Sequence, residues 1–393
     1  MKTHRKALLI LFLTVFIDLV GFGMVIPLLA LYGHEFHASS TEIGLLGGVY
    51  SFMQFLMAPV WGSLSDRFGR RPILLSSLFG IACAYVVFSQ ATTFSTLFWS
   101  RALAGFFAAN ISTAVAYVAD VTSAEDRAKG MGFIGAAFGL GFVFGPAIGG
   151  IAGQHGMQWP PIIAAVLSFT AFLLAMGLLP ESRTPGGTAR ELGLKPLAKA
   201  FSHPVLSRWM YAYLLYMVAV ASMEIAFPLL VAGPPFHYMQ RETGYLFTYL
   251  GLVVAAIQGG AIRRMKRSQE APTAKRGTVF SIVGLAMLPF VHTLPLLVLG
   301  LTCLAIGQGF TQPTLMGLIS RNASSEEQGT VLGVSQSLAS FGRIVGPPLA
   351  GLLYGWAIPG PFLFAAAVVV AVLALIIAAS QTPLDPPQGP AGA

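Results

Sequence analysis

Apolar runs long enough to cross a lipid bilayer recur along almost the whole chain. A helix of roughly 20 residues spans a hydrocarbon core of about 30 Å. Backbone groups in lipid must be hydrogen-bonded within the segment, which a helix achieves. Only 10% of the 393 residues are charged, whereas a soluble domain carries roughly 25%. We therefore expect an all-α integral membrane protein. Its twelve expected helices cover residues 7–31, 42–64, 72–91, 95–119, 129–153, 160–179, 205–231, 243–263, 276–292, 294–320, 328–355 and 360–379.

Lysine and arginine gather in alternate loops between these helices. If the N-terminus is cytoplasmic, 20 of the 23 Lys and Arg residues fall in the N-terminal arm, the central linker or inward-facing loops. This asymmetry is the positive-inside rule, which fixes orientation. We therefore interpret the net charge of +8 as serving to orient the protein in the membrane and to contact anionic lipids, and not as a sign of nucleic-acid binding. Both termini are expected in the cytoplasm.

The sequence repeats itself with an offset of 201 residues. The matched pairs are Pro27 with Pro228, Glu125 with Glu326, Asp126 with Glu327, and the series Gly132, Gly141, Gly145, Pro146 and Gly150 with Gly333, Gly342, Gly346, Pro347 and Gly351. Six helices per repeat give both halves the same orientation, and parallel repeats of this kind form transporters that bind substrate at the midplane between the halves. The expected domains are a six-helix bundle at 1–179, a cytoplasmic linker at 180–204, a second six-helix bundle at 205–380 and a disordered tail at 381–393.

Other sequence features narrow the class of protein. The start of the chain resembles a signal peptide, but its apolar run is too long, so we expect it to be the first helix. Cys83 and Cys303 fall inside expected helices and have no spacing typical of a disulfide framework or a metal site. No nucleophile–base constellation is visible. Neither an enzyme activity, a cofactor nor a metal is expected.

The segment GSLSDRFGRRP at 62–72 joins the second and third expected helices. Gly69 allows a tight turn and close backbone approach. Asp66, Arg67 and Arg70 place fixed charges at helix ends. A carboxylate near a helix N-terminus gains roughly 0.3–1 kcal/mol when exposed and up to about 2 kcal/mol when partly buried, which suits a gate that must form and break. Taken alone, the segment also fits a positive-inside loop with a turn glycine.

Several motifs together resemble one family. The loop at 62–72 resembles the signature G-x-L-x-D-R-x-G-R-R of the major facilitator superfamily. The segment LFWSRALAGFFAAN at 97–110 resembles the fourth-helix arginine motif of its proton-coupled members, and GFIGAAFGLGFVFGPAIGG at 132–150 fits the fifth-helix antiporter motif. The segments AYVADVTSAEDRAKGMGF and SRNASSEEQGTVLG further resemble drug:proton antiporters of the tetracycline-resistance type. The resemblance implies the major facilitator fold of two parallel six-helix repeats.

The resemblance also implies roles for particular residues. Asp66 would face the start of the eleventh helix, Arg70 would pair with Asp120 to lock the cytoplasmic side, and Arg101 would tune a proton site on the first helix. The small residues of the fifth helix would pack it on the eighth, since such residues let helices approach closely; they are Gly141, Gly145, Pro146, Gly149 and Gly150. Position 267, opposite Asp66 in the repeat, is Arg, so one cytoplasmic lock of this type is expected.

Two acidic residues fall deep inside expected helices, Asp18 and Glu224. An ionisable residue at the bilayer centre costs about 2.5–3.5 kcal/mol on insertion scales and is a functional-site hypothesis by default. Desolvation raises a carboxyl pKa and a nearby cation lowers it, so Asp18 is suited to gain and lose a proton between conformations. The alternative for Asp18 is a structural hydrogen bond between helices. Glu224 has no acidic repeat partner; it is either a second proton site, a selector of cationic substrates, or a structural partner of a group such as Arg343.

Helical spacing outlines a substrate surface. The candidate binding residues are Tyr50, Met53, Gln54, Met57, Asn110, Tyr213, Met217, Glu224, Gln308, Gln312 and Gln336. Large adaptable side chains with few polar anchors suit a broad amphiphilic substrate, although such stripes are more often helix packing. The resemblance to the tetracycline-resistance type implies acids in the third and ninth helices and a histidine in the eighth. This chain carries none of them in those expected helices, so recognition of tetracycline itself is not expected.

The expected function is proton-driven export of small amphiphilic or cationic compounds by alternating access, as in multidrug efflux and antibiotic resistance. The alternatives are an exporter or flippase of an endogenous lipid or metabolite, and a receptor or scaffold that does not transport. The expected setting is the bacterial inner membrane, with a monomer that meets protons, a small-molecule substrate and anionic lipids on the cytoplasmic side.

Overall fold

The computed structural model describes residues 2–108, 110–122, 127–182, 204–322 and 328–381. In these ranges the regular secondary structure is helical and no strand occurs; turns and short irregular segments join the helices. All twelve expected apolar segments are helical where they are described, so the predicted all-α fold is confirmed. The expected C-terminal tail and most of the expected linker lie outside the described residues, as do Glu125, Asp126, Glu326 and Glu327.

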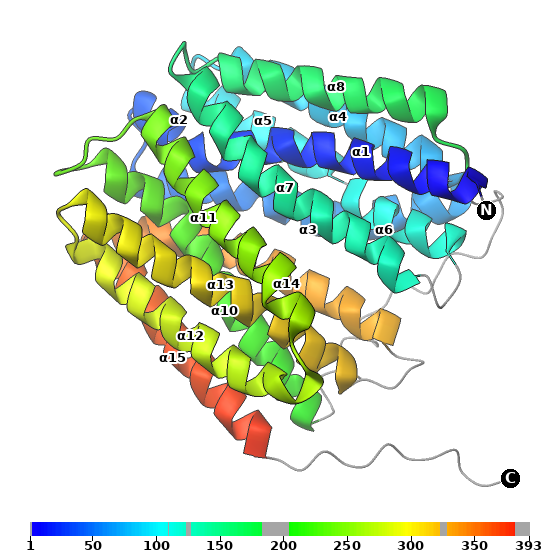
Figure 1. Ribbon diagram of the computed structural model, residues 1–393. Coiled ribbons are helices and arrows are strands. Elements are labelled where there is room, and N and C mark those ends of the chain that lie inside the picture. The colour runs from blue at the N-terminus through cyan, green and yellow to red at the C-terminus, as the bar shows by residue number, and fades with distance from the viewer. Residues whose placement is uncertain (1, 109, 123–126, 183–203, 323–327, 382–393) are drawn as a thin grey trace, which may run out of the picture. The chain divides into compact units, whose positions relative to one another are not determined.

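The first half of the chain forms eight α-helices and a 3-10 turn within the described residues (Figure 1). They are α1 (Lys2–Val25), η1 (Ile26–Leu28), α2 (Leu29–Glu35), α3 (Ser40–Phe68), α4 (Arg70–Ser89), α5 (Phe94–Phe107), α6 (Asn110–Val121), α7 (Arg127–Gly153) and α8 (Trp159–Leu178). In the second half the longer helices are α10 (Pro204–Ala232), α11 (Gln240–Gly260), α12 (Glu270–Met287), α13 (Leu294–Arg321), α14 (Gln328–Trp356) and α15 (Gly360–Gln381).

Among the described residues, ten helical segments are long and apolar enough to cross a membrane by length and composition. The helices α12 and α14 are not among them. The first turns of α12 carry Glu270, Lys275 and Arg276, and α14 carries Gln336 and Arg343. The expected count of twelve membrane-spanning helices therefore depends on α12 and α14. If these two helices cross the membrane, their polar groups need protein or a cavity beside them.

Two expected helices are interrupted. The segment 7–31 was expected to be continuous, but Pro27 lies in η1 and separates α1 from α2, because proline cannot donate a backbone hydrogen bond and crowds the preceding turn. The segment 95–119 was likewise expected to be continuous. The helix α5 ends at Phe107, and Ala108 has a non-helical ψ of 55° before α6 begins. Apolar periodicity alone does not reveal either break.

Residue contacts divide the chain into two compact units. Unit 1 comprises Met1–Leu192, Glu224–Leu252 and Pro347–Ile358, and unit 2 comprises Gly193–Met223, Val253–Gly346 and Pro359–Ala393. The helices α10, α11 and α14 thus contribute residues to both units. The expected division into bundles at 1–179 and 205–380 stays a prediction.

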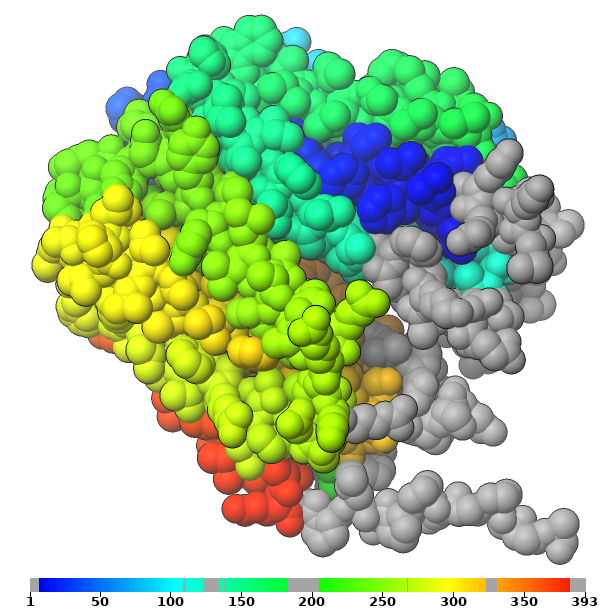
Figure 2. Space-filling view, viewed as in Figure 1, coloured from blue at the N-terminus to red at the C-terminus, as the bar shows by residue number. Residues whose placement is uncertain are grey.

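Within unit 1, α1 is the central helix. It packs against α7 and α8, while α4 packs against α5 and α8, and α3 against α5 (Figure 1). Figure 2 shows the blue surface of α1 between the blue-green surface of α7 and the green surface of α8. Because α1 carries Asp18, this arrangement places the acid inside the helix bundle of unit 1.

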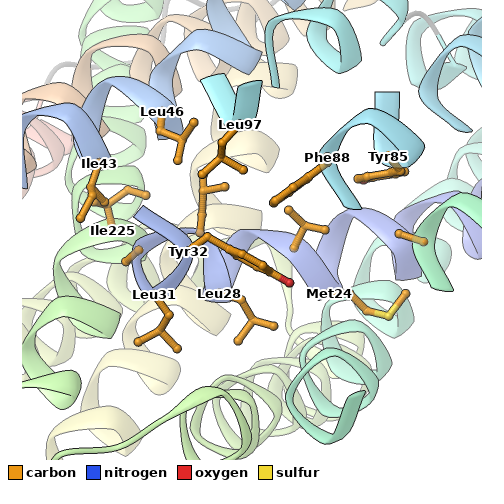
Figure 3. Packing of buried hydrophobic residues seen from close by; sticks show 14 of the residues in the cluster. Met24, Leu28, Leu31, Tyr32, Ile43, Leu46, Tyr85, Phe88, Leu97 and Ile225 are labelled. Atoms are coloured by element: carbon orange, nitrogen blue, oxygen red, sulfur yellow. The ribbon is translucent and has the colours of Figure 1, made fainter. Parts of the chain in front are cut away.

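A buried apolar cluster gathers around Tyr32 at one end of unit 1 (Figure 3). The Tyr32 ring meets the edge of the Phe88 ring at a centroid distance of 4.9 Å. Its hydroxyl donates to the carbonyl of Met157 at 2.6 Å, which satisfies the one polar atom of this side chain. Ile225 of α10 also belongs to the cluster. This packing holds α1, α3, α4 and the start of α8 together.

Within unit 2, α12 packs closely on α13 and α15. The approach of α12 to α13 depends on small residues: a Cβ on Gly284 would lie 2.7 Å from the Leu304 nitrogen, and a Cβ on Gly307 would lie 2.6 Å from the Ser281 nitrogen. Small residues at helix contacts replace the hydrophobic driving force that lipid does not supply.

Candidate functional site

The break between α5 and α6 is held by side chains from neighbouring helices. When a helix ends, its last carbonyls lose their intrahelical partners. Three donors take them here: Trp61 Nε1 donates to Phe106 O at 2.6 Å, Gln54 Nε2 donates to Ala108 O at 3.3 Å, and Ser77 Oγ donates to Phe107 O. The sequence pattern placed Gln54 on a substrate surface. The structure gives it a hydrogen bond that ties α3 to the end of α5.

The other expected substrate residues of α3 also lie along α5. A Cβ on Gly105 would lie 2.9 Å from Cβ of Met53, so glycine is what allows α3 and α5 to meet there. Tyr50 is buried, and Met53 and Met57 are partly buried. The side chain of Asn110 lies outside those that the structure describes. The binding role of this group stays a prediction.

Asp18 lies in the buried interior of unit 1. Its side chain is 4% exposed, and Ser168 of α8 donates a hydrogen bond to Oδ1 at 3.2 Å. Unpaired carboxylates are strongly disfavoured in such surroundings. The hydrogen bond is the structural contact that the sequence left open as the alternative for Asp18, and it is compatible with both protonation states because a carboxyl oxygen accepts in each.

Arg101 is a second buried charge in unit 1. Its side chain is 2% exposed, and its guanidinium carbon lies 4.7 Å from the centre of the Tyr50 ring, a cation–π contact. It hydrogen-bonds the hydroxyl of Tyr85, while its Nε and Nη1 have no hydrogen-bond partner among the described residues. A buried cation with unused donors costs free energy. An anionic group beside Arg101, or a change in the protonation of a neighbouring acid, is therefore expected to change the electrostatic free energy of this side chain strongly.

Tyr85 was missed by the sequence analysis. This fully buried phenol of α4 feels the charges of both Asp18 and Arg101. It therefore lies within electrostatic range of both charged residues, which come from α1 and α5. A single tyrosine among apolar residues gives no periodic signal, so the sequence pattern did not identify Tyr85.

The turn between α3 and α4 is built on Gly69. This residue has φ of 101°, a conformation that side chains with a Cβ rarely adopt. A Cβ at Gly69 would also lie 2.8 Å from the carboxyl carbon of Glu181. Glu181 accepts the backbone N–H groups of Arg70 at 2.8 Å and of Arg71 at 3.1 Å. It thereby caps the first turn of α4, where unpaired N–H groups and the helix dipole favour a carboxylate.

Arg70 is the centre of an ionic network at this turn. Its Nε donates to Asp120 Oδ2 at 2.9 Å and its Nη2 lies 2.8 Å from Asp66 Oδ1. Its Nη1 donates to Ser65 Oγ at 3.0 Å. The pairing of Arg70 with Asp120 that the family resemblance implies is present, and its role as a gate stays a prediction, as does the expected position of Asp66 relative to the eleventh helix.

We expect Arg70→Gln to destabilise the protein by about 1–3 kcal/mol, because it leaves Asp66 and Asp120 without their shared cation, and the side chains of Arg70 and Asp66 are largely buried. The thermal unfolding midpoint of the purified protein measures this loss. Arg67→Gln is the matched control, since Arg67 is exposed and adjacent and a surface charge contributes about 0–1 kcal/mol. Equal midpoints for the two variants would show that the network does not hold the turn.

The expectation of one cytoplasmic lock of the type that Asp66, Arg70 and Asp120 form stays a prediction, but unit 2 contains a different ion pair near the corresponding turn. In unit 2, Arg321 at the end of α13 forms an ion pair with Glu270 at the start of α12. The offset of 201 matches Arg321 with Asp120 and Glu270 with Gly69, so the two halves place an ion pair at related positions with the charges reversed.

The glycines of α7 face two helices. The expectation that they pack mainly on α11 is wrong for three of them: a Cβ on Gly141, Gly145 or Gly149 would lie 2.7 Å from atoms of Leu19, Gly23 or Met24, all in α1. These three are spaced four apart and so share one helix face. Gly150 does meet α11, where its Cβ would lie 2.9 Å from Gln240 O, and so does Gly153, whose Cβ would lie 2.8 Å from Gln240 Cβ. The carbonyl of Pro146 also contacts α11, at Gly244.

Unit 2 carries the remaining expected substrate residues. Tyr213 of α10 hydrogen-bonds Gln312 of α13, and both Tyr213 and Met217 are buried. Gln308 lies one turn before Gln312 and is partly buried. Gln336 of α14 is exposed. Glu224, in the part of α10 that belongs to unit 1, is partly buried. Its expected roles as a proton site or a substrate contact stay predictions.

Among the described residues, no three His, Cys, Asp or Glu side chains are grouped so that they could hold a metal ion.

Comparisons with known proteins agree with the motifs. The sequence model of the Major Facilitator Superfamily matches residues 11–347 and 272–393. Major facilitator superfamily domain-containing protein 10 of Bos taurus is 31% identical, over 89% of this chain and 88% of its own. Tetracycline resistance protein, class C, of Escherichia coli is 32% identical, over 90% of this chain and 91% of its own.

A solved structure shares the fold. The crystal structure of the human organic anion transporter MFSD10 (TETRAN) superposes with a TM-score of 0.72 and 26% sequence identity. The match covers 95% of this chain and 99% of the other.

Proposed function

The chain belongs to the major facilitator superfamily of membrane transporters, and on that premise we propose that it is a proton-coupled secondary active transporter that exports small amphiphilic compounds. The observation that carries this proposal is the buried pair of charged side chains in unit 1. Asp18 is 4% exposed and Arg101 2% exposed, and both act electrostatically on Tyr85. A buried carboxyl near a cation is a group whose proton affinity changes strongly with small changes in distance and hydration.

Coupling follows from differential affinity. A ligand shifts a conformational equilibrium only by the difference in its affinity for the two states. If the proton and the substrate favour different states, the downhill movement of protons drives the uphill movement of substrate. The proposal assigns the proton to Asp18, with Arg101 and Tyr85 as the groups that set its affinity; Glu224 is proposed as a further acidic group in the pathway.

The relatives leave the charge of the substrate open. One is titled an organic anion transporter and another a tetracycline resistance protein. The proposal therefore covers amphiphilic compounds of either charge, and an endogenous lipid or metabolite falls within it as an alternative substrate.

The experiment uses the purified full chain in proteoliposomes that contain a pH-sensitive dye. After a pH gradient is imposed, a panel of amphiphilic drugs, a lysophospholipid and nucleosides is added one compound at a time. The expected result is substrate-dependent proton movement above that of protein-free vesicles. A receptor or scaffold predicts no such movement with any compound, and that result would contradict the proposal.

We further propose a monomer in the plasma membrane, as in the inner membrane of a bacterium, with both termini and the Arg70 turn in the cytoplasm. The bias of Lys and Arg toward alternate loops supports this orientation, and the same residues favour anionic lipids on that face. Reporter fusions at the two termini test it: activity of a cytoplasm-specific reporter at both ends is expected, and activity at neither would reverse the orientation.

A further inference from the structure

Three helices bring polar groups together in unit 2. Tyr213 of α10 hydrogen-bonds the side chain of Gln312 in α13, and the charge of Arg343 in α14 acts on the same phenol. Tyr213 is 3% exposed and is surrounded by an apolar helix sequence. Polar side chains on facing membrane helices must find protein or water-filled space beside them. Here they converge from α10, α13 and α14.

Arg343 has no counter-ion in the described structure. Its Nη2 donates to Ser340 Oγ at 3.3 Å, one turn earlier on the same helix, and it forms no ion pair with any described carboxylate. Arg343 lies near the middle of α14 and is partly buried. An arginine in this place is expensive to keep and marks a functional group. A neutral hydroxyl is a weak partner for a guanidinium, which has five donors.

The neighbouring unpartnered groups are also donors. Nε2 of Gln308, one turn from Gln312 on α13, is buried and has no hydrogen-bond partner among the described residues. The indole Nε1 of Trp209, one turn from Tyr213 on α10, is likewise buried and unpartnered. A buried donor without an acceptor costs free energy. The two unpartnered nitrogens can only donate, so each of them needs an acceptor atom.

We propose that Arg343, with Gln308 and Tyr213, forms a binding subsite for the anionic oxygens of an organic anion, in the chemical class of a carboxylate or sulfonate. A guanidinium binds such groups through paired, charge-assisted hydrogen bonds. Met217, buried on the same face of α10, offers an adaptable apolar contact for the rest of the molecule. This inference rests on the proposed transport function, and it narrows the amphiphilic substrate of either charge to an organic anion.

The test uses three probes with one ring system and fixed charge: naphthalene-1-sulfonate, 1-naphthylmethanol and (1-naphthylmethyl)trimethylammonium. Fixed charges keep the probes unaffected by pH. Dissociation constants are measured by titration calorimetry on the full chain in detergent, without a proton gradient. The wild type is expected to bind the sulfonate most tightly. In R343Q the sulfonate is expected to bind about 10- to 100-fold more weakly, as for loss of a charged hydrogen bond, with the alcohol unchanged.

Two further variants keep the test decisive if R343Q does not fold. R343K keeps the charge but loses the planar pair of donors, so its affinity for the sulfonate is expected between those of wild type and R343Q. Q308L removes one donor and is expected to weaken the sulfonate alone. R263Q removes an exposed arginine of the same half and is expected to match the wild type.

The proposal is overturned if the wild type binds the sulfonate no more tightly than the ammonium probe, or if the Arg343 and Gln308 variants bind it as the wild type does. These results are independent of proton coupling, because no gradient is present. Absence of proton movement in the proteoliposome assay, together with the expected sulfonate preference, would reject the transport mechanism and keep the subsite.

Discussion

Asp18→Asn is expected to abolish concentrative transport while the protein stays folded. Asparagine has nearly the same shape and keeps an oxygen that accepts the hydrogen bond of Ser168, at 3.2 Å in the native protein, but it cannot bind and release a proton. The accumulation ratio of substrate in proteoliposomes with a pH gradient measures the effect and is expected to fall to about 1, the value for a carrier whose affinity no longer depends on protonation. Exchange of labelled for unlabelled substrate, which needs no net proton transfer, is expected to persist.

Ser168→Ala is the matched control for this prediction. It removes the hydrogen bond to Asp18 and keeps the acid, so concentrative transport is expected to remain, with a cost in stability of about 0.5–3 kcal/mol for the lost hydrogen bond. The thermal unfolding midpoint separates the two effects. Full accumulation by Asp18→Asn would assign Asp18 the structural role and remove it from coupling.

Gly244→Val is expected to produce the second large loss of transport. A Cβ at Gly244 of α11 would lie 2.5 Å from Pro146 O and 2.8 Å from the Gly150 Cα, both in α7. These are backbone atoms, so the added side chain cannot be accommodated by a rotamer change. Overpacking of this kind costs about 1–3 kcal/mol, which lowers the population of the closely packed state by about 5- to 150-fold. Initial rates of substrate uptake measure the loss.

Gly259→Val provides a control on the same helix. Gly259 is also in α11, but a Cβ there would meet no atom within 4 Å, so transport close to the wild-type rate is expected. If both variants lost activity equally, helix propensity and not the contact between α7 and α11 would explain the effect. If both were active, close approach at Gly244 would be dispensable.

Local sequence patterns predicted several parts of the candidate site. The signature loop placed Gly69 at a turn, and its φ of 101° is the conformation that such a loop requires. The same motif, through the family resemblance, implied the pair of Arg70 and Asp120, which lie 2.9 Å apart. Asp18 was also identified from the sequence, because it is an acid in an otherwise apolar segment. A carboxylate inside a membrane helix is costly without a partner.

Contacts between residues distant in sequence were not predicted. Glu181 caps α4 from a position 111 residues away from Arg70, and its local sequence resembles any polar segment after a helix. Tyr85 has no special neighbours in the sequence. The spacing of Gly141, Gly145 and Gly149 shows that they share a face, but not that α1 is the helix they meet.

The sequence by itself determined the fold class, because a long apolar segment in lipid can satisfy its backbone hydrogen bonds within itself only as a helix. The family motifs assigned the superfamily. The tertiary structure decided which helices meet, where the fourth apolar segment breaks, and which polar atoms remain unpartnered, as at Arg101 and Gln308. The physical reason is that helix formation depends on near neighbours along the chain, whereas the pairing of a buried donor depends on side chains that only packing brings into reach.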